Sequence, residues 1–292
     1  MPHYLLLTIF ACLAFGIAAV LQKYGVSKKV GKVSLKGFAG KWKELLKSFI
    51  ANPVWIAGVL LEGIAAALFF QALSEGEITV VQPLVNLNVA VTVILGVLFL
   101  HERLSGIELV SVVLFTCGAL LIGLGAQKVA QGGYPLQPLI VLSGFSVAIV
   151  FLALVVPLLL KKSSWEVPFS IATGIMFGMG TLYMKVISID VLSSGQEFVI
   201  VSPYTWWAML KTFSIWFFIL WSILGFLFLQ ISFSHGRVSI VMPVVTVVSM
   251  IVPFISGLFL FSEKVGPTRV AGLLFLAAGS LLMIFKKNKQ NI

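Results

Sequence analysis

One carboxylate stands alone in the middle of a long apolar run. Glu62 lies near the centre of the run 52–73, between Leu61 and Ile64. An ionised carboxylate at mid-bilayer depth costs about 2.5–3.5 kcal/mol, so such a residue should face a bundle interior or a wet cavity. Its chemistry would be the binding of a proton or a cation, and the alternative is a structural carboxyl that is protonated or paired with a lysine. We favour the binding role, which makes Glu62 the metal ligand if a cation is carried.

A second group of polar residues lies on the next apolar run. One helical face carries Thr79, Gln82 and Asn86. Pro83 interrupts the backbone hydrogen bonds of the helix between them. A later run carries a comparable set, with Pro243, Thr246, Ser249 and Pro253. Helices broken at corresponding places in two halves of a chain indicate a transport site. Such hydroxyl and amide groups also join membrane helices to one another, and both readings stay open. We take the three prolines as helix breaks.

Three further polar residues extend the candidate pathway. Gln71 and Gln230 lie in corresponding runs of the two halves. Lys185 lies near one end of the run 169–187, where snorkelling to the interface explains it. Pairing with a glutamate or with a substrate carboxylate is the alternative. We include all three in the predicted path of the substrate or ion.

The composition indicates that these residues belong to a membrane protein. The chain of 292 residues is 60% hydrophobic and only 10% charged, whereas soluble domains average about 25% charged residues. The net charge of +10 indicates basic loops against anionic lipid rather than a nucleic-acid partner. Zinc, P-loop and nucleotide fingerprints and a nucleophile elbow are absent from the sequence, so we expect no enzyme and no cofactor.

Nine apolar runs are long enough to span a bilayer as helices. They are 4–21, 52–73, 79–100, 106–125, 139–160, 169–187, 213–233, 238–261 and 270–285. The sequence therefore predicts an all-α integral membrane protein with about nine transmembrane helices. Between the first two runs, residues 26–50 are rich in lysine with aromatic and leucine residues at helical spacing, which predicts a basic amphipathic helix on the membrane face.

The chain repeats itself. Gly76 and Pro83 correspond to Gly236 and Pro243, each 160 residues later. Spans 1–4 thus match spans 6–9, and a repeat distance of five spans, an odd number, gives the two halves opposite orientation. We predict a first repeat at 1–126, a linking span within 127–165 and a second, inverted repeat at 166–292.

Basic residues predict the orientation of the chain. With the lysine-rich segment inside, the inner span ends collect fifteen lysines and arginines and the outer ends only four. This places the N-terminus outside and the C-terminus in the cytoplasm, in a plasma or inner membrane.

Several short motifs stand out along these runs, namely Asn52-Pro53-Val54-Trp55, Ala57-Gly58, Val81-Gln82-Pro83-Leu84 and Leu100-His101-Glu102-Arg103-Leu104. With the short loops, they resemble the drug/metabolite transporter superfamily with its EamA-type repeats. The motifs and the nine-span layout with a lone helix between halves are similar to the NIPA-type branch, a family associated with magnesium transport. That branch has a Gly-Glu pair in the second span at about Ala65-Ala66, and Glu62 stands about one helical turn away.

We therefore expect a transporter that moves a small solute by alternating access, coupled to a proton or another ion. One alternative is a NIPA-like transporter of magnesium or another divalent cation that uses the same residues. A second is a non-transporting membrane scaffold or lipid-binding protein. The expected partners are the lipid bilayer and a small-molecule or cation substrate, with no nucleic acid, and a homodimer is compatible with this organisation.

Overall fold

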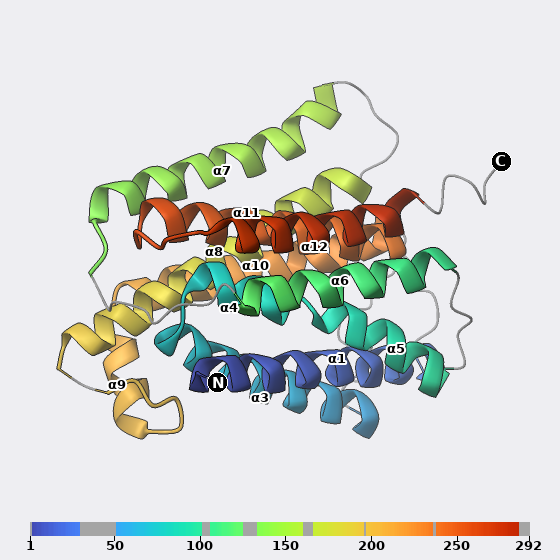
Figure 1. Ribbon diagram of the computed structural model, residues 1–292, viewed down its shortest axis with the longest axis horizontal. Coiled ribbons are helices and arrows are strands. Elements are labelled where there is room, and N and C mark those ends of the chain that lie inside the picture. Colours follow the sequence, from blue (N-terminus) through green and yellow to red (C-terminus); the bar gives the residue numbers. More distant parts are fainter. Residues whose placement is uncertain are drawn as a thin grey trace.

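The described part of the chain is entirely helical. The computed structural model describes residues 2–29, 51–100, 106–124, 133–159, 166–195, 197–235 and 238–285. Its helices are α1 (His3–Lys29), α3 (Pro53–Glu75), α4 (Ile78–Val85), α5 (Asn88–Leu100), α6 (Gly106–Leu124), α7 (Leu136–Leu159), α8 (Glu166–Ser193), α9 (Pro203–Lys211), α10 (Ser214–His235), α11 (Val238–Phe259) and α12 (Pro267–Phe285) (Figure 1). Each predicted apolar run is helical, and residues 30–50 of the predicted amphipathic segment lie outside the described residues.

The helices suit a bilayer by length and composition. Within the described residues, five stretches are long and apolar enough to cross a membrane, and α9 with α10 makes a sixth if this pair, bent by 92°, is one span. Shorter apolar helices cover 109–124, 244–259 and 267–279. These features confirm an all-α integral membrane protein.

The start of α3 shows how the sequence sets a helix boundary. The Asn52 side-chain oxygen accepts hydrogen bonds from the amides of Val54 and Trp55 at 3.1 and 3.3 Å, and Pro53 occupies the first turn. Both are standard features of a helix N-terminus. The Asn52 amide nitrogen also donates to the Gly25 carbonyl at 2.7 Å, which ties α3 to α1.

Of the predicted breaks, the structure contains one. The third span divides into α4 and α5, and the amides of Leu87 and Val89 bond to carbonyls three residues back instead of four. The division falls at Asn86 and Leu87, just after Pro83, which itself lies inside α4. The predicted breaks at Pro243 and Pro253 are wrong, because α11 is continuous across both. Neighbouring helices hold α11 together, as is common for prolines in membrane helices.

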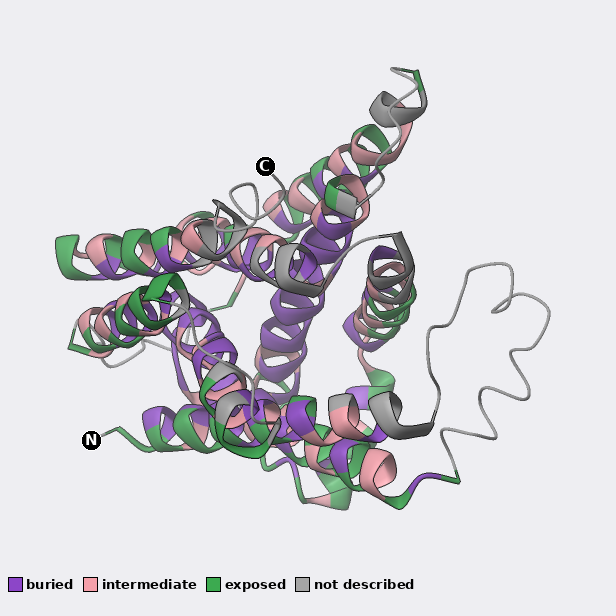
Figure 2. Ribbon diagram, turned by 90° about the vertical axis from the view of Figure 1, so that its right-hand side faces the viewer, coloured by how far each residue is buried: buried purple, intermediate pink, exposed green. Residues whose placement is uncertain are grey.

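The bundle is organised around α8. Helix α1 packs against α3 and α5, α8 packs against α10 and α11, and α6 packs against α12. The last pair is close, because a Cβ placed on Gly118 or Gly272 would come within 2.7 or 2.6 Å of the other residue's carbonyl oxygen. In the apolar part of α8, 78% of residues are buried, against 17% in α7. Figure 2 shows the buried residues in the middle of the bundle and the exposed ones at its periphery.

Candidate functional site

A buried ion pair joins two turns that are far apart in the sequence. Arg269, in the first turn of α12, places its Nη2 atom 2.5 Å from a carboxylate oxygen of Glu77, between α3 and α4. No part of the Arg269 side chain is exposed, and only 6% of the Glu77 side chain is. Arg269 also donates to the Thr79 hydroxyl at 3.4 Å. Charges this deeply buried need such partners, because desolvation of each ion is costly.

A second buried carboxylate caps the N-terminus of α4. Glu263 accepts hydrogen bonds from the amides of Ile78 and Thr79 at 2.8 and 3.0 Å and from the Thr79 hydroxyl at 2.6 Å. The first amides of a helix lack partners inside it, and the helix dipole favours a negative charge there. Glu263 belongs to the α11–α12 turn, so the cap fastens that turn to α4. Thr79 thereby links the Glu77–Arg269 pair to the second carboxylate, Glu263.

The turn that carries Glu263 is shaped for this contact. Ser262 adopts φ = 53°, the left-handed region that residues other than glycine seldom occupy, and the Glu263 amide donates back to the Gly257 carbonyl at 2.8 Å. Gly257 lies against Thr79, and a Cβ there would overlap the Thr79 side chain and come within 2.8 Å of a Glu263 carboxylate oxygen. The close approach of α11 to α4 at this point requires glycine.

Lys185 supplies the second buried cation. Only 4% of it is exposed, and its ammonium donates to the carbonyls of Leu73 and Gly76 at 2.6 and 2.7 Å, at the end of α3. It also interacts electrostatically with Glu263 and Glu77. The expectation that Lys185 snorkels to the interface is wrong, because the ammonium points into the bundle and binds the C-terminal carbonyls of a neighbouring helix, where a cation is favoured.

The predicted polar face of α4 is buried beside this network. The Gln82 side-chain oxygen accepts from the Thr181 hydroxyl on α8 at 3.0 Å. Asn86 ends α4, is 9% exposed, and its amide nitrogen has no hydrogen-bond partner among the described residues. Thr246 and Ser249 are both buried on α11, which packs against α4. A buried amide nitrogen without a partner is uncommon in folded proteins.

Other predicted residues lie away from this region. Glu62 is exposed on α3 and accepts a hydrogen bond from Gln22 of α1 at 2.6 Å, so the expectation that it faces the bundle interior is wrong. The interior side of α3 at this level is taken by Ala65, which is fully buried. Gln230 lies on α10, and its side chain is outside the described part. A role for either residue in the pathway stays a prediction.

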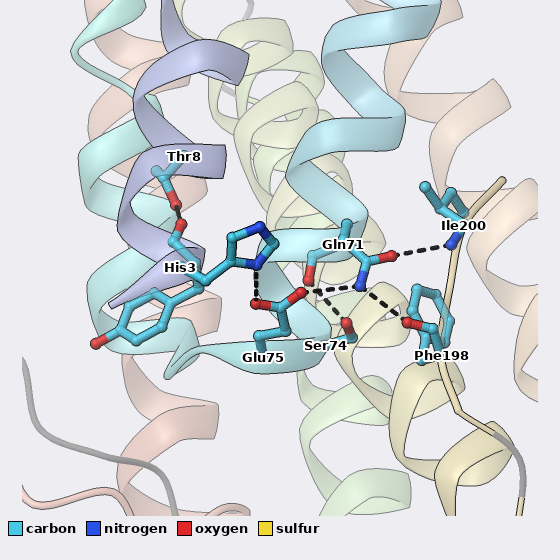
Figure 3. A network of polar contacts seen from close by, with 8 residues as sticks. His3, Thr8, Gln71, Ser74, Glu75, Phe198 and Ile200 are labelled. Atoms are coloured by element: carbon cyan, nitrogen blue, oxygen red, sulfur yellow. Dashed lines mark hydrogen bonds and ion pairs between the residues drawn. The ribbon is translucent and has the colours of Figure 1, made fainter. Parts of the chain in front are cut away.

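Gln71 holds a surface loop in place. Its amide nitrogen donates to Glu75 and to the Phe198 carbonyl, both at 2.9 Å, and its oxygen accepts from the Ile200 amide at 2.9 Å (Figure 3). Glu75 in turn lies 2.7 Å from His3. These hydrogen bonds use both the nitrogen and the oxygen of the Gln71 amide. Gln71 therefore positions the loop that contains Phe198 and Ile200.

Sequence reasoning missed the network itself. The sequence predictions did not include Glu263 or Arg269, yet Glu263 caps α4 and Arg269 is fully buried. A signal was present, because the predicted span order brings the turn after span 2 and the turn before span 9 to the same end of the bundle. Opposite charges at those two turns, Glu77 and Arg269, were the indication of a pair.

The arrangement brings carboxylate oxygens, which cations prefer as ligands, into the bundle interior. Two carboxylates and two cations give a network without net charge in a low-dielectric interior, where each charge strongly affects the others. No three His, Cys, Asp or Glu side chains gather into a metal cage in the described part of the chain. A dication would meet two carboxylates and neutral oxygens here, a set in which Mg²⁺ retains several of its waters.

Comparison with known proteins agrees with this picture. Residues 33–124 match the EamA-like transporter family. The chain is 26% identical over 299 aligned positions to "Probable magnesium transporter NIPA9" of Arabidopsis thaliana, which covers 95% of this chain and 78% of that protein. No solved structure matches significantly. The resemblance expected from the sequence motifs is thereby confirmed.

Proposed function

We propose that this membrane transporter of the drug/metabolite type carries Mg²⁺ across the membrane by alternating access. The observation that carries the proposal is the buried network, because it contains two buried carboxylates, Glu77 and Glu263, and two cations, Arg269 and Lys185, that balance their charge. Mg²⁺ is bound in proteins through one or two carboxylates with much of its water shell kept. The resemblance of nearly the whole chain to a protein named as a probable magnesium transporter supports the same choice of cargo.

The proposed architecture is two inverted repeats, 1–126 and 166–292, joined by the linking helix α7. Corresponding helices make corresponding contacts, which supports this division: α1 packs against α3 and α5, as α8 packs against α10 and α11. The last helices of the two repeats, α6 and α12, pack against each other. Motion of one repeat against the other would expose the polar face of α4 to either side in turn.

The proposed orientation places the network at the outer end of the bundle. Lysine bias puts the N-terminus outside and the C-terminus in the cytoplasm of a plasma or inner membrane. Glu77 and Glu263 then lie at the outer ends of their spans. Their contacts join α3, α4 and α12, so the conformation described here is closed on the outside.

Magnesium influx into proteoliposomes with an internal Mg²⁺ indicator tests this function. We expect influx with the wild type and its loss in Glu263→Gln, which removes a charge and keeps the size of the side chain. The exposed variant Lys264→Gln serves as the control and should transport normally. Glu62→Gln, measured beside them, decides whether Glu62 contributes, because loss of influx would place it on the path. Absence of influx from wild-type protein that elutes as a folded, monodisperse species would reject the proposal.

A small organic solute is the second candidate cargo. The unpartnered amide of Asn86, beside the hydroxyl-bearing face of α8 and α11, favours it, because amides and hydroxyls recognise polar groups of metabolites. The EamA-like match over 33–124 is equally consistent with such a cargo. A competition experiment distinguishes the two cargoes. A solute carrier should take up a labelled metabolite, and excess Mg²⁺ should leave that uptake unchanged.

A further inference from the structure

Lys185 has a hydrogen-bond pattern that would survive the loss of a proton. Its ammonium donates to two backbone carbonyls, Leu73 and Gly76, and the described residues show no third acceptor. An ammonium has three N–H donors, and a neutral amine has two. Both hydrogen bonds to α3 can therefore persist when the third proton leaves.

Lys185 is also the cation of the network that can change its charge. Arg269 remains protonated under all ordinary conditions, whereas a lysine can exist as an ammonium or as a neutral amine. Lys185 is 4% exposed, and its ammonium hydrogen-bonds only neutral groups among the described residues, so no carboxylate compensates directly for its burial. Glu77 and Glu263 act on it at longer range.

Other titratable groups near Lys185 could supply the proton in its place. Helices α3, α4, α7, α9, α10 and α11 pack against α8. Among them α4, α7 and α11 contain no titratable side chain. The remaining groups on these helices are Glu62 and Glu75 on α3, Tyr204 and Lys211 on α9, and His235 at the far end of α10. Helix α8 itself also carries Glu166, Tyr183 and Asp190, and Asp190 accepts hydrogen bonds from Tyr134 and Ser214. Tyr4 of α1 completes the surroundings of the network, because it interacts with Glu77, Glu263 and Arg269.

We propose that Lys185 exchanges its proton for the transported cation. The proposal rests on the proposed function and names its coupling ion. When Mg²⁺ binds at Glu77 and Glu263, one N–H bond of Lys185 breaks, the electron pair stays on Nζ, and the proton passes to water. A dication added to the neutral network would leave two positive charges in excess, and release of the proton removes one of them in a medium where like charges repel strongly.

Calorimetry of the purified full-length protein tests this exchange without any mutation. Mg²⁺ is titrated into the protein in detergent, in two buffers of different ionisation enthalpy, and the difference gives the protons released per ion bound. We expect about one proton per Mg²⁺. The affinity for Mg²⁺ should accordingly rise about tenfold per pH unit in the range where the proton is released.

Three variants assign the proton to Lys185. Lys185→Arg keeps the charge and cannot release a proton, so it should bind Mg²⁺ more weakly and without proton release. Lys185→Met lacks the charge, and it should bind Mg²⁺ without proton release and with little dependence on pH. The exposed Lys211→Met is the matched control and should behave as the wild type.

The outcomes separate this proposal from the proposed function. Magnesium binding by the wild type without proton release overturns the exchange and leaves magnesium transport standing. Proton release that persists in Lys185→Met also overturns it, because another group then supplies the proton. Folded wild-type protein that neither binds nor transports Mg²⁺ overturns both.

Discussion

The guanidinium of Arg269 lies 2.5 Å from the carboxylate of Glu77, and 0% and 6% of the two side chains are exposed. Arg269 lies in the first turn of α12, and Glu77 lies in the turn that leads into α4, so the pair connects two distant parts of the chain at one end of the bundle. The desolvation of two buried ions offsets much of the attraction between them. We infer that the pair is retained because it can form and separate during transport.

Removing one partner of this pair should destabilise the protein strongly. Arg269→Gln leaves Glu77 buried without its cation, which costs about 3–5 kcal/mol. The double variant with Glu77→Gln and Arg269→Gln removes both charges and should recover part of that loss. Thermal unfolding in detergent measures the effect, with Lys264→Gln as the exposed control. Equal stability of the single variant and the wild type would show that the pair is not buried.

A methyl group at position 257 should separate α11 from α4. Gly257→Ala would overlap the Thr79 side chain and crowd the Glu263 carboxylate, so we expect a loss of about 1–3 kcal/mol. Gly63→Ala is the matched control, because nothing lies within 4 Å of a Cβ at that position. The control should be as stable as the wild type or more so. If both variants unfold at the same temperature, the close contact at Thr79 is contradicted.

Asn86 should matter for transport more than for stability. Its amide nitrogen has no partner among the described residues, so replacement by leucine of similar size removes no hydrogen bond from that atom. We expect Asn86→Leu to unfold near the wild-type temperature and to transport more slowly by on the order of tenfold, the worth of one hydrogen bond to the cargo. Unchanged transport would remove Asn86 from the pathway.

Tyr134 should make the stability of the protein depend on alkaline pH. Burial, followed by a hydrogen bond to Asp190 at 2.7 Å, raises the pKa of Tyr134 from 10.0 to about 12. A pKa that is higher in the folded state means that the contribution is present below pH 10 and is lost as the pH rises towards 12. Tyr134→Phe should flatten this loss, measured as the unfolding temperature between pH 8 and 12. The exposed Tyr204→Phe should keep the wild-type slope, and an equal effect of both variants would refute the assignment.

The apolar runs made most of the fold predictable. Every predicted run is helical in the described part, because long apolar stretches in lipid must satisfy their own backbone groups. Asn52 and Pro53 also marked the start of α3 correctly, because capping depends on residues next to one another in the sequence. Proline was a weaker guide: the third span divides just after Pro83, whereas α11 runs through Pro253, since packing against neighbouring helices decides how a proline is accommodated.

The site was less predictable because burial of polar residues depends on packing. Gln82 and Asn86 were correctly placed on a buried face by their spacing. Glu62 was expected inside from its depth in the span, but depth does not fix which side of a helix a residue occupies, and it lies on the exposed side. Arg269 meets Glu77, and Glu263 meets Thr79, only through the tertiary arrangement of turns, which no local pattern in the sequence reports.

The most direct test of the account asks whether the network closes one end of the transport path. Gln82→Cys is introduced into protein in which Cys12 and Cys117 are replaced by alanine, and a membrane-impermeant maleimide is applied from outside. Gln82 is 5% exposed, so we predict slow labelling with the network intact and fast labelling when Glu77→Gln and Arg269→Gln are both added. An exposed cysteine at position 210 should label quickly in both proteins. Labelling at position 82 that is the same with and without the ion pair would contradict the account.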